Sequence, residues 1–228
     1  MKQNLYDSFA ERWLQGGTVF FYSDPHFGDS ELNPNRKNYP GDEEQVKLIN
    51  SKIGKKDTII FLGDIGDMSY IQKIRGRKIL IMGNHDAGAS NYTRKVVNLG
   101  SYDKYVEKYG KPTDKCFYRC SDGNLYYDNH YFDEVYEGIL VISDKILLSH
   151  EPVNCPHLMF NIHGHVHSMP GNRQNFINSL NVCAENIDYT PVSLTSIVKS
   201  GLLSNVPNIH RITIDNATKR KNSKKIVC

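Results

Sequence analysis

The 228-residue sequence lacks any run of about 18 apolar residues, so a membrane-spanning helix is not expected. Its first fifteen residues mix charged with apolar side chains and lack the uninterrupted apolar stretch of a secretory signal. Internal repeats are absent, and so are linkers rich in proline, glycine or serine. These absences predict a single cytoplasmic domain without a membrane partner, long enough to bury a core.

Cysteine is scarce and its number is odd, which does not suit a disulfide framework. The widely spaced residues are typical of reduced cytosolic thiols. One close pair exists but has no second pair at metal-binding spacing, so we do not predict a structural zinc site. The cysteines are Cys116, Cys120, Cys155, Cys183 and Cys228.

Positive charge is in small excess, with a formal net charge of +3. Five basic residues lie between Lys219 and Lys225, and without them the remainder would carry a charge of −2. We therefore predict a domain over residues 1–215 and a disordered basic tail over residues 216–228. Electrostatic binding of the tail to nucleic acid remains the alternative to a solubilising role.

Apolar segments alternate with helical ones, which indicates an α/β fold. An amphipathic helix is predicted over residues 43–53, and a second over 193–203 with Ser193 as a possible cap. Residues 116–136 contain the turn signal Asp122-Gly123 and predict one or two hairpins, which could overhang the functional site. The predicted strands are 18–23, 58–62, 78–82, 145–149, 161–162, 179–183 and 209–214.

Polar clusters follow most of the predicted strands directly, at the sheet edge where α/β folds hold their ligands. The clusters offer carboxylate, amide and imidazole ligands without a thiolate, which suits Mn, Fe, Zn or Ni. Seven ligands are too many for one open catalytic metal, whereas two metals that share a carboxylate use seven naturally. The candidate ligands are Asp24, His26, Asp64, Asn84, His150, His165 and His167.

These clusters resemble the ordered motifs of the calcineurin-like metallophosphoesterases, and in particular the compact bacterial and phage enzymes of that superfamily. The resemblance extends from about Thr18 to Leu203. It implies a four-layer α-β-β-α sandwich with a dinuclear metal site at the carboxyl ends of the strands. It also implies hydrolysis of a phosphomonoester or phosphodiester by metal-bound hydroxide. The motifs are Asp24-Pro-His26, Gly63-Asp64-Ile-Gly-Asp67, Gly83-Asn84-His85-Asp86, His150 and Gly164-His165-Val-His167.

The resemblance also assigns roles to the ligands. Asp64 is expected to bridge the two metals. The first metal would be held by Asp24, His26 and His167, and the second by Asn84, His150 and His165.

Other residues of the motifs are expected to act around the metals. His85 is expected to face the phosphate and stabilise charge or protonate the leaving oxygen, with Asp86 holding its ring. Asp67 and His163 are expected behind the ligands. Asp29 departs from the family, in which a histidine often stands at this position.

The identity of the substrate stays open at this point. A small or nucleotide-like ester is favoured, with Mn as the metal, and Arg173 is either a phosphate clamp or an ordinary loop residue. A nuclease assisted by the basic tail is one alternative. A non-catalytic scaffold is another, although scaffold members of the superfamily typically lack ligands that this sequence retains.

Overall fold

The computed structural model describes residues 4–86, 131–154, 159–167 and 178–206, together with three short strands at 95–97, 117–119 and 125–127. Three predicted features lie wholly outside these residues. They are the strand at 209–214, the loop residue Arg173 and the basic tail at 216–228.

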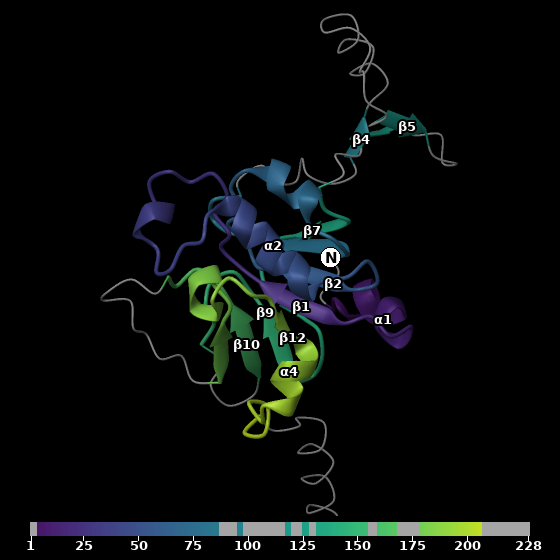
Figure 1. The fold of residues 1–228 in the computed structure, drawn as a ribbon. Coiled ribbons are helices and arrows are strands. Elements are labelled where there is room, and N and C mark those ends of the chain that lie inside the picture. The colour runs from purple at the N-terminus through teal and green to yellow at the C-terminus, as the bar shows by residue number, and fades with distance from the viewer. Residues whose placement is uncertain are drawn as a thin grey trace, which may run out of the picture.

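The first sheet has five strands in the order β12-β1-β2-β3-β7 (Figure 1). Strands β1, β2, β3 and β7 are parallel, and β12 pairs antiparallel with β1. The structure confirms three predicted strands as β1, β2 and β3. The bounds are β1 Val19–Tyr22, β2 Thr58–Phe61, β3 Arg77–Ile81, β7 Glu134–Tyr136 and β12 Val192–Ser193.

The second sheet has four strands in the order β11-β10-β9-β8. Strands β9, β10 and β11 are parallel, and β8 is antiparallel to β9. The predicted strands at 145–149, 161–162 and 179–183 are confirmed. The bounds are β8 Leu140–Val141, β9 Ile146–Leu148, β10 Phe160–His163 and β11 Ser179–Asn181.

Alternation along β1 shows why its residues form a central strand. Val19 and Phe21 belong to the core between the two sheets, whereas Phe20 and Tyr22 belong to a second core beneath helix α2. Successive side chains of a strand point to opposite faces, so a strand buried on both faces consists mostly of apolar residues. The two sheets, with helices packed on and beside them, confirm the layered α/β fold.

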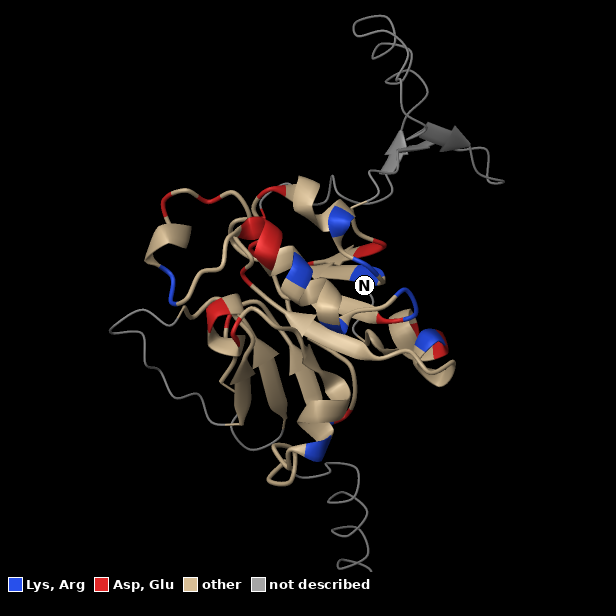
Figure 2. Ribbon diagram, in the orientation of Figure 1, with Lys and Arg blue, Asp and Glu red and all other residues tan. Residues whose placement is uncertain are grey.

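Helix α2 (Asp42–Lys52) covers the outer face of the first sheet together with the 3-10 helix η2 (Met68–Lys73). The acidic first turn of α2, red in Figure 2, complements the positive end of the helix dipole. Helix α4 (Leu194–Lys199) follows its predicted cap Ser193, whose side chain accepts a hydrogen bond from the Ser196 backbone, but it ends at Lys199 and does not reach the predicted residue 203. No sequence pattern had indicated helix α1 (Tyr6–Leu14), which buries Phe9.

Three further strands form a separate antiparallel sheet in the order β4-β6-β5. They are β4 Lys95–Val97, β5 Phe117–Arg119 and β6 Leu125–Tyr127. The antiparallel pairing of β5 with β6 on either side of Asp122-Gly123 confirms a predicted hairpin. The expectation that this region overhangs the site lies outside the described residues. In the part of the chain that the structure describes, no helix is long and apolar enough to cross a membrane.

Candidate metal centre

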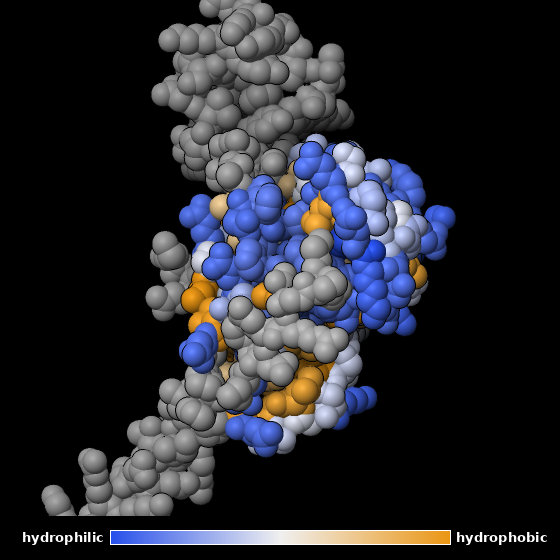
Figure 3. Space-filling model, turned by 90° about the vertical axis from the view of Figure 1, so that its left-hand side faces the viewer, coloured by the Kyte–Doolittle hydropathy of each residue, from blue (hydrophilic) through white to orange (hydrophobic). Residues whose placement is uncertain are grey.

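The predicted ligands meet at the carboxyl ends of the parallel strands. Asp24 follows β1, Asp64 follows β2, and Asn84 follows β3 in the first sheet, while His150 follows β9 and His165 follows β10 in the second. Parallel strands bring residues distant in sequence to one edge of a sheet. Figure 3 faces this side of the molecule, whose described surface is mostly hydrophilic with a smaller hydrophobic area.

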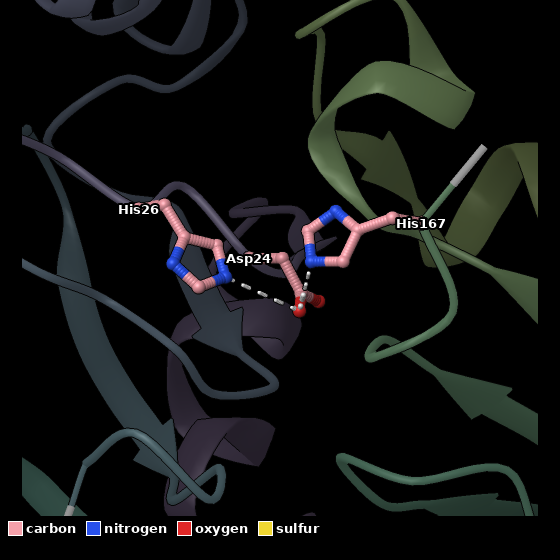
Figure 4. Close-up of side chains that lie close together, drawn as sticks. All are labelled: Asp24, His26 and His167. Carbon is pink, nitrogen blue, oxygen red and sulfur yellow. Dashed lines mark ion pairs between the residues drawn. The ribbon is translucent and has the colours of Figure 1, made fainter. Parts of the chain in front are cut away.

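The first group consists of Asp24, His26 and His167 (Figure 4). The Nε2 atoms of His26 and His167 lie 3.9 and 3.6 Å from the same oxygen, Asp24 Oδ1. These distances are too long for hydrogen bonds. They suit ligands that surround a cation, because each ligand atom lies about 2.0–2.2 Å from a bound metal.

Two atoms of this first group are buried without a hydrogen-bond partner. They are Asp24 Oδ1 and His26 Nε2, which face each other across the gap. The other oxygen of Asp24, Oδ2, accepts hydrogen bonds from the His165 backbone at 2.9 Å and from Cys183 Sγ at 3.1 Å. Leaving a buried polar atom unsatisfied costs about 1–3 kcal/mol. A bound cation would remove that cost, so these residues fit a metal.

The second group consists of Asp64, His150 and His165, with Asn84 beside them. His150 Nε2 lies 3.3 Å from Asp64 Oδ2, 2.9 Å from Asn84 Oδ1 and 3.1 Å from His165 Nδ1. His165 Nδ1 in turn lies 3.1 Å from Asn84 Oδ1. Two nitrogens and two oxygens therefore surround a second point that could hold a cation.

Asp64 connects the two groups through one atom. Its Oδ2 lies 3.7 Å from His26 Nε2 in the first group and 3.3 Å from His150 Nε2 in the second. Its Oδ1 instead accepts a hydrogen bond of 2.9 Å from the His85 backbone N–H. This arrangement fixes the carboxylate and directs Oδ2 toward both groups.

Outer contacts orient three of the imidazoles. His150 Nδ1 lies 2.6 Å from the Leu62 carbonyl, which can only accept, so His150 donates there and its Nε2 is free to bind a metal. His167 Nδ1 lies 2.6 Å from Glu185 Oε1, and His26 Nδ1 lies 3.5 Å from Asp29 Oδ2. Asp29 thus contacts a candidate ligand and also lines the cavity above it. Such carboxylate or carbonyl contacts are typical of metal-binding histidines.

Backbone strain is concentrated in the candidate ligands. The backbone angle φ is 54° at Asp24, 45° at His26, 54° at Asp64 and 66° at His165. Residues with side chains adopt such positive values rarely, at a cost of about 1–3 kcal/mol each. The surrounding fold therefore holds four of the seven candidate ligands in strained turns, as is typical of functional sites.

Carboxylates give the centre a negative potential. Burial lowers the pKa of His150, but its hydrogen bond to Asp64 and the charges of Asp24 and Asp64 outweigh burial and raise the pKa to about 9. Burial also lowers the pKa of His167, but the hydrogen bond to Glu185 and the charge of Asp24 outweigh burial and raise that pKa. The same potential would stabilise divalent cations bound between these groups.

His85 projects into the centre without joining either group. Its side chain is exposed, lines the cavity above the ligands and stands edge-on to the His26 ring, with ring centroids 5.5 Å apart.

Asp86 does not hold the His85 ring, contrary to the expectation from sequence. It is buried and accepts hydrogen bonds from the backbone N–H groups of Asp64, Ile65 and Gly83, so it holds the two strand-end loops together.

Of the two residues expected behind the ligands, Asp67 has a local role, whereas His163 lies close enough to Asp24, His150 and His165 to feel their charges. Asp67 is exposed and caps η2 by accepting a 2.9 Å hydrogen bond from the Ser69 backbone, and its described contacts include none of the seven candidate ligands. His163 is buried in β10, with Nδ1 2.8 Å from the Gly164 carbonyl.

Two residues of the centre were missed by sequence reasoning. Glu185 lies in the 3-10 helix η4 (Ala184–Ile187), and Arg36 follows the 3-10 helix η1 (Asn33–Asn35). Burial opposes ionisation of Glu185, but the bond with His167 and the charge of Arg36 outweigh it and lower its pKa to about 2. Glu185 lies just beyond a strand end, which is the signal that located the other residues. Arg36 gave no such signal, because it lies in an irregular polar loop.

Two cavities open at the centre. One, of about 410 Å³, lies over both groups and includes Asp29, Glu31 and His85 in its walls. The other, of about 380 Å³, shares Asn84 with it and is lined in part by the apolar side chains of Met82, Ile139, Pro152 and Val153. The described part of the chain therefore offers space for a phosphate with an organic group beside it.

Close packing of Gly164 against the first group gives a stability prediction. A Cβ atom at Gly164 would lie 1.9 Å from Ser23 Oγ and 2.3 Å from Asp24 Oδ2. We expect Gly164→Ala to lower the free energy of unfolding by about 1–3 kcal/mol through overpacking. Gly54→Ala is the matched control, because its Cβ would lie 3.4 Å from Asp57 Oδ2. Urea unfolding of both metal-free variants checks the prediction, and equal stabilities would contradict it.

Comparison with known proteins places the chain in a family. A model of the family "Calcineurin-like phosphoesterase" matches residues 17–182, so the chain belongs to the calcineurin-like phosphoesterases. An uncharacterized protein of Methanocaldococcus jannaschii is 29% identical over 193 residues, which cover 79% of this chain and 89% of that protein. The crystal structure of a protein of unknown function from Aquifex aeolicus has a similar fold. Its TM-score is 0.51 at 23% identity, over 80% of this chain and 98% of that one.

Proposed function

We propose that the protein is a phosphoesterase that depends on two divalent metal ions, with manganese as the metal. Asp24, His26 and His167 would hold one ion, and Asp64 would bridge to the other. Asn84, His150 and His165 would complete the second site. The observation that carries the proposal is the position of Asp64 Oδ2, within 3.7 Å of an imidazole nitrogen in each group.

The chemistry divides between the ions and the chain. Two cations held by these residues would neutralise the phosphate oxygens and make a water nucleophilic at neutral pH. His85 would contact the phosphate or the leaving oxygen from the cavity wall, either stabilising charge or donating a proton. Its backbone N–H fixes Asp64 at the same time, while Asp86 holds the loops that carry both residues. Since no side chain needs to act as nucleophile, a covalent enzyme intermediate is not expected.

Charges in the cavities support a small substrate with a single phosphodiester group. Asp29, Glu31, Asp64 and Glu151 line the two cavities, and none of their described lining residues is lysine or arginine. A monoester carries a charge of about −1.5 to −2 at pH 7, more than the single charge of a diester. Once two cations occupy the ligands, the acidic walls would therefore favour the diester, with its organic group in the neighbouring cavity.

The test is hydrolysis by the Mn-loaded full chain of bis-p-nitrophenyl phosphate, p-nitrophenyl phosphate, cyclic nucleotides and single-stranded DNA. We expect the first ester to be cleaved with a higher kcat/KM than the second. A preference for DNA would indicate a nuclease. Absence of all hydrolysis by protein shown to contain metal would refute the proposal and favour a scaffold.

A further inference from the structure

A buried ion pair lies directly behind the first ligand group. The side chains of Arg36 and Glu185 are 0% and 1% exposed, and Arg36 Nη2 pairs with Glu185 Oε2. Arg36 Nε lies 3.1 Å from the same oxygen, so two nitrogens of Arg36 donate to one oxygen of Glu185. Burying both charges is expensive, and well-packed apolar residues would often serve stability equally well. The pair therefore calls for an explanation other than stability.

Arg36 holds the strained turn that carries two candidate ligands. Its Nη2 donates to the Asp24 carbonyl at 2.7 Å, and its Nη1 donates to the Pro25 carbonyl at 3.0 Å. These bonds fasten the backbone where Asp24 and His26 both have positive φ. A guanidinium with five fixed donors suits this task, because it can bind two successive carbonyls and a carboxylate together.

Glu185 acts on the third ligand of the same group. One of its oxygens, Oε2, accepts from Arg36, and the other, Oε1, lies 2.6 Å from His167 Nδ1. A carboxylate there favours a proton on Nδ1, which leaves Nε2 to face Asp24 Oδ1 at 3.6 Å. The pair thus contacts Asp24 and His167 directly and His26 through the intervening turn.

We propose that Arg36 and Glu185 are positioning residues that shape the first metal subsite, formed by Asp24, His26 and His167, and leave the second subsite unaffected. The inference rests on the proposed metal assignment and adds that only one of the two metal subsites depends on this ion pair. Loss of an outer contact typically lowers metal affinity about 10–100-fold. We expect that loss in the first subsite, because the contacts of the pair reach Asp24 and His167, which both belong to it.

The experiment is titration of the metal-free full chain with Mn²⁺, followed by electron paramagnetic resonance and by counting bound ions after dialysis. The native chain should bind two ions and show the signal of a spin-coupled pair. Glu185→Gln should bind the ion of the first subsite about 10–100-fold more weakly. At limiting Mn²⁺ it should therefore show the signal of an isolated ion.

Stability needs a separate control, because Glu185→Gln leaves Arg36 buried without its carboxylate. The double variant Arg36→Met/Glu185→Gln removes both charges but also the bonds to the Asp24 and Pro25 carbonyls, so its Tm should recover in part while its weak Mn²⁺ binding persists. Glu134→Gln breaks an ion pair with Arg77 that touches none of the candidate ligands. It should lower Tm and leave Mn²⁺ binding unchanged.

The outcomes separate this inference from the proposed function. If the native chain binds no coupled pair of ions, the metal assignment itself fails. If the native chain binds a coupled pair and Glu185→Gln binds it with equal affinity, only the positioning role is overturned. Equal weakening of both subsites, or recovery of full Mn²⁺ affinity in the double variant, would also overturn it.

Discussion

Replacing Asp64 with asparagine is expected to lower kcat/KM for bis-p-nitrophenyl phosphate by about 10³-fold or more, which corresponds to about 4 kcal/mol. Asparagine keeps the size of the side chain but removes the negative charge from the atom shared by the two groups. Both cations would lose a ligand, and the repulsion between them would no longer be offset. Steady-state kinetics at saturating Mn²⁺, together with metal content, measure the effect.

The control for this variant is Asp67→Asn. Asp67 belongs to the same sequence motif but caps η2 and is exposed. Asparagine can still accept the Ser69 N–H as an N-cap, so we expect little change in stability and a change in kcat/KM of less than about twofold. If Asp64→Asn retained native activity and two ions, Asp64 would not be the bridging ligand.

Removal of the His85 ring is expected to lower kcat by about 10²–10⁴-fold while both ions remain bound. The hydrogen bond to Asp64 comes from the His85 backbone, so His85→Ala should keep it. The ring itself belongs to neither ligand group. Single-turnover kinetics with Mn-loaded protein, alongside ion counting, would separate an effect on the reaction from an effect on metal binding.

The leaving group distinguishes the two possible roles of His85. A residue that protonates the leaving oxygen matters more when that oxygen is a poor leaving group. The loss of rate in His85→Ala should therefore be larger for a phenyl ester than for a p-nitrophenyl ester. Equal losses would indicate charge stabilisation instead, and loss of a metal ion would mean that His85 is a ligand.

The central strands were predictable because each is a short apolar run buried on both faces, as in Val19–Tyr22 and Thr58–Phe61. Helix α1 was not predictable by the same reasoning. Only Ser8 and Phe9 of its nine residues are buried, and its position depends on distant contacts. One is the bond from the Leu5 backbone to the Val141 carbonyl, and another joins Ser8 to Glu134. No local pattern encodes such contacts.

The candidate ligands followed from the rule that strand ends converge at one edge of a sheet. That rule locates Asp24, Asp64 and His150 from the sequence alone. It could not reveal that the Asp86 carboxylate binds backbone N–H groups of the strand-end loops and not the His85 ring. It also missed Arg36, because the contact with Glu185 joins residues 149 positions apart. Pairwise contacts across such separations depend on the folded chain rather than on local sequence.

The number of Mn²⁺ ions bound per chain tests the central claim most directly. The account predicts that the full 228-residue chain, equilibrated with Mn²⁺ and freed of excess metal, contains two ions per chain by mass spectrometry. Electron paramagnetic resonance of the same sample should show that they are spin-coupled, as expected of ions that share Asp64. One ion per chain, or two ions without coupling, would contradict the account.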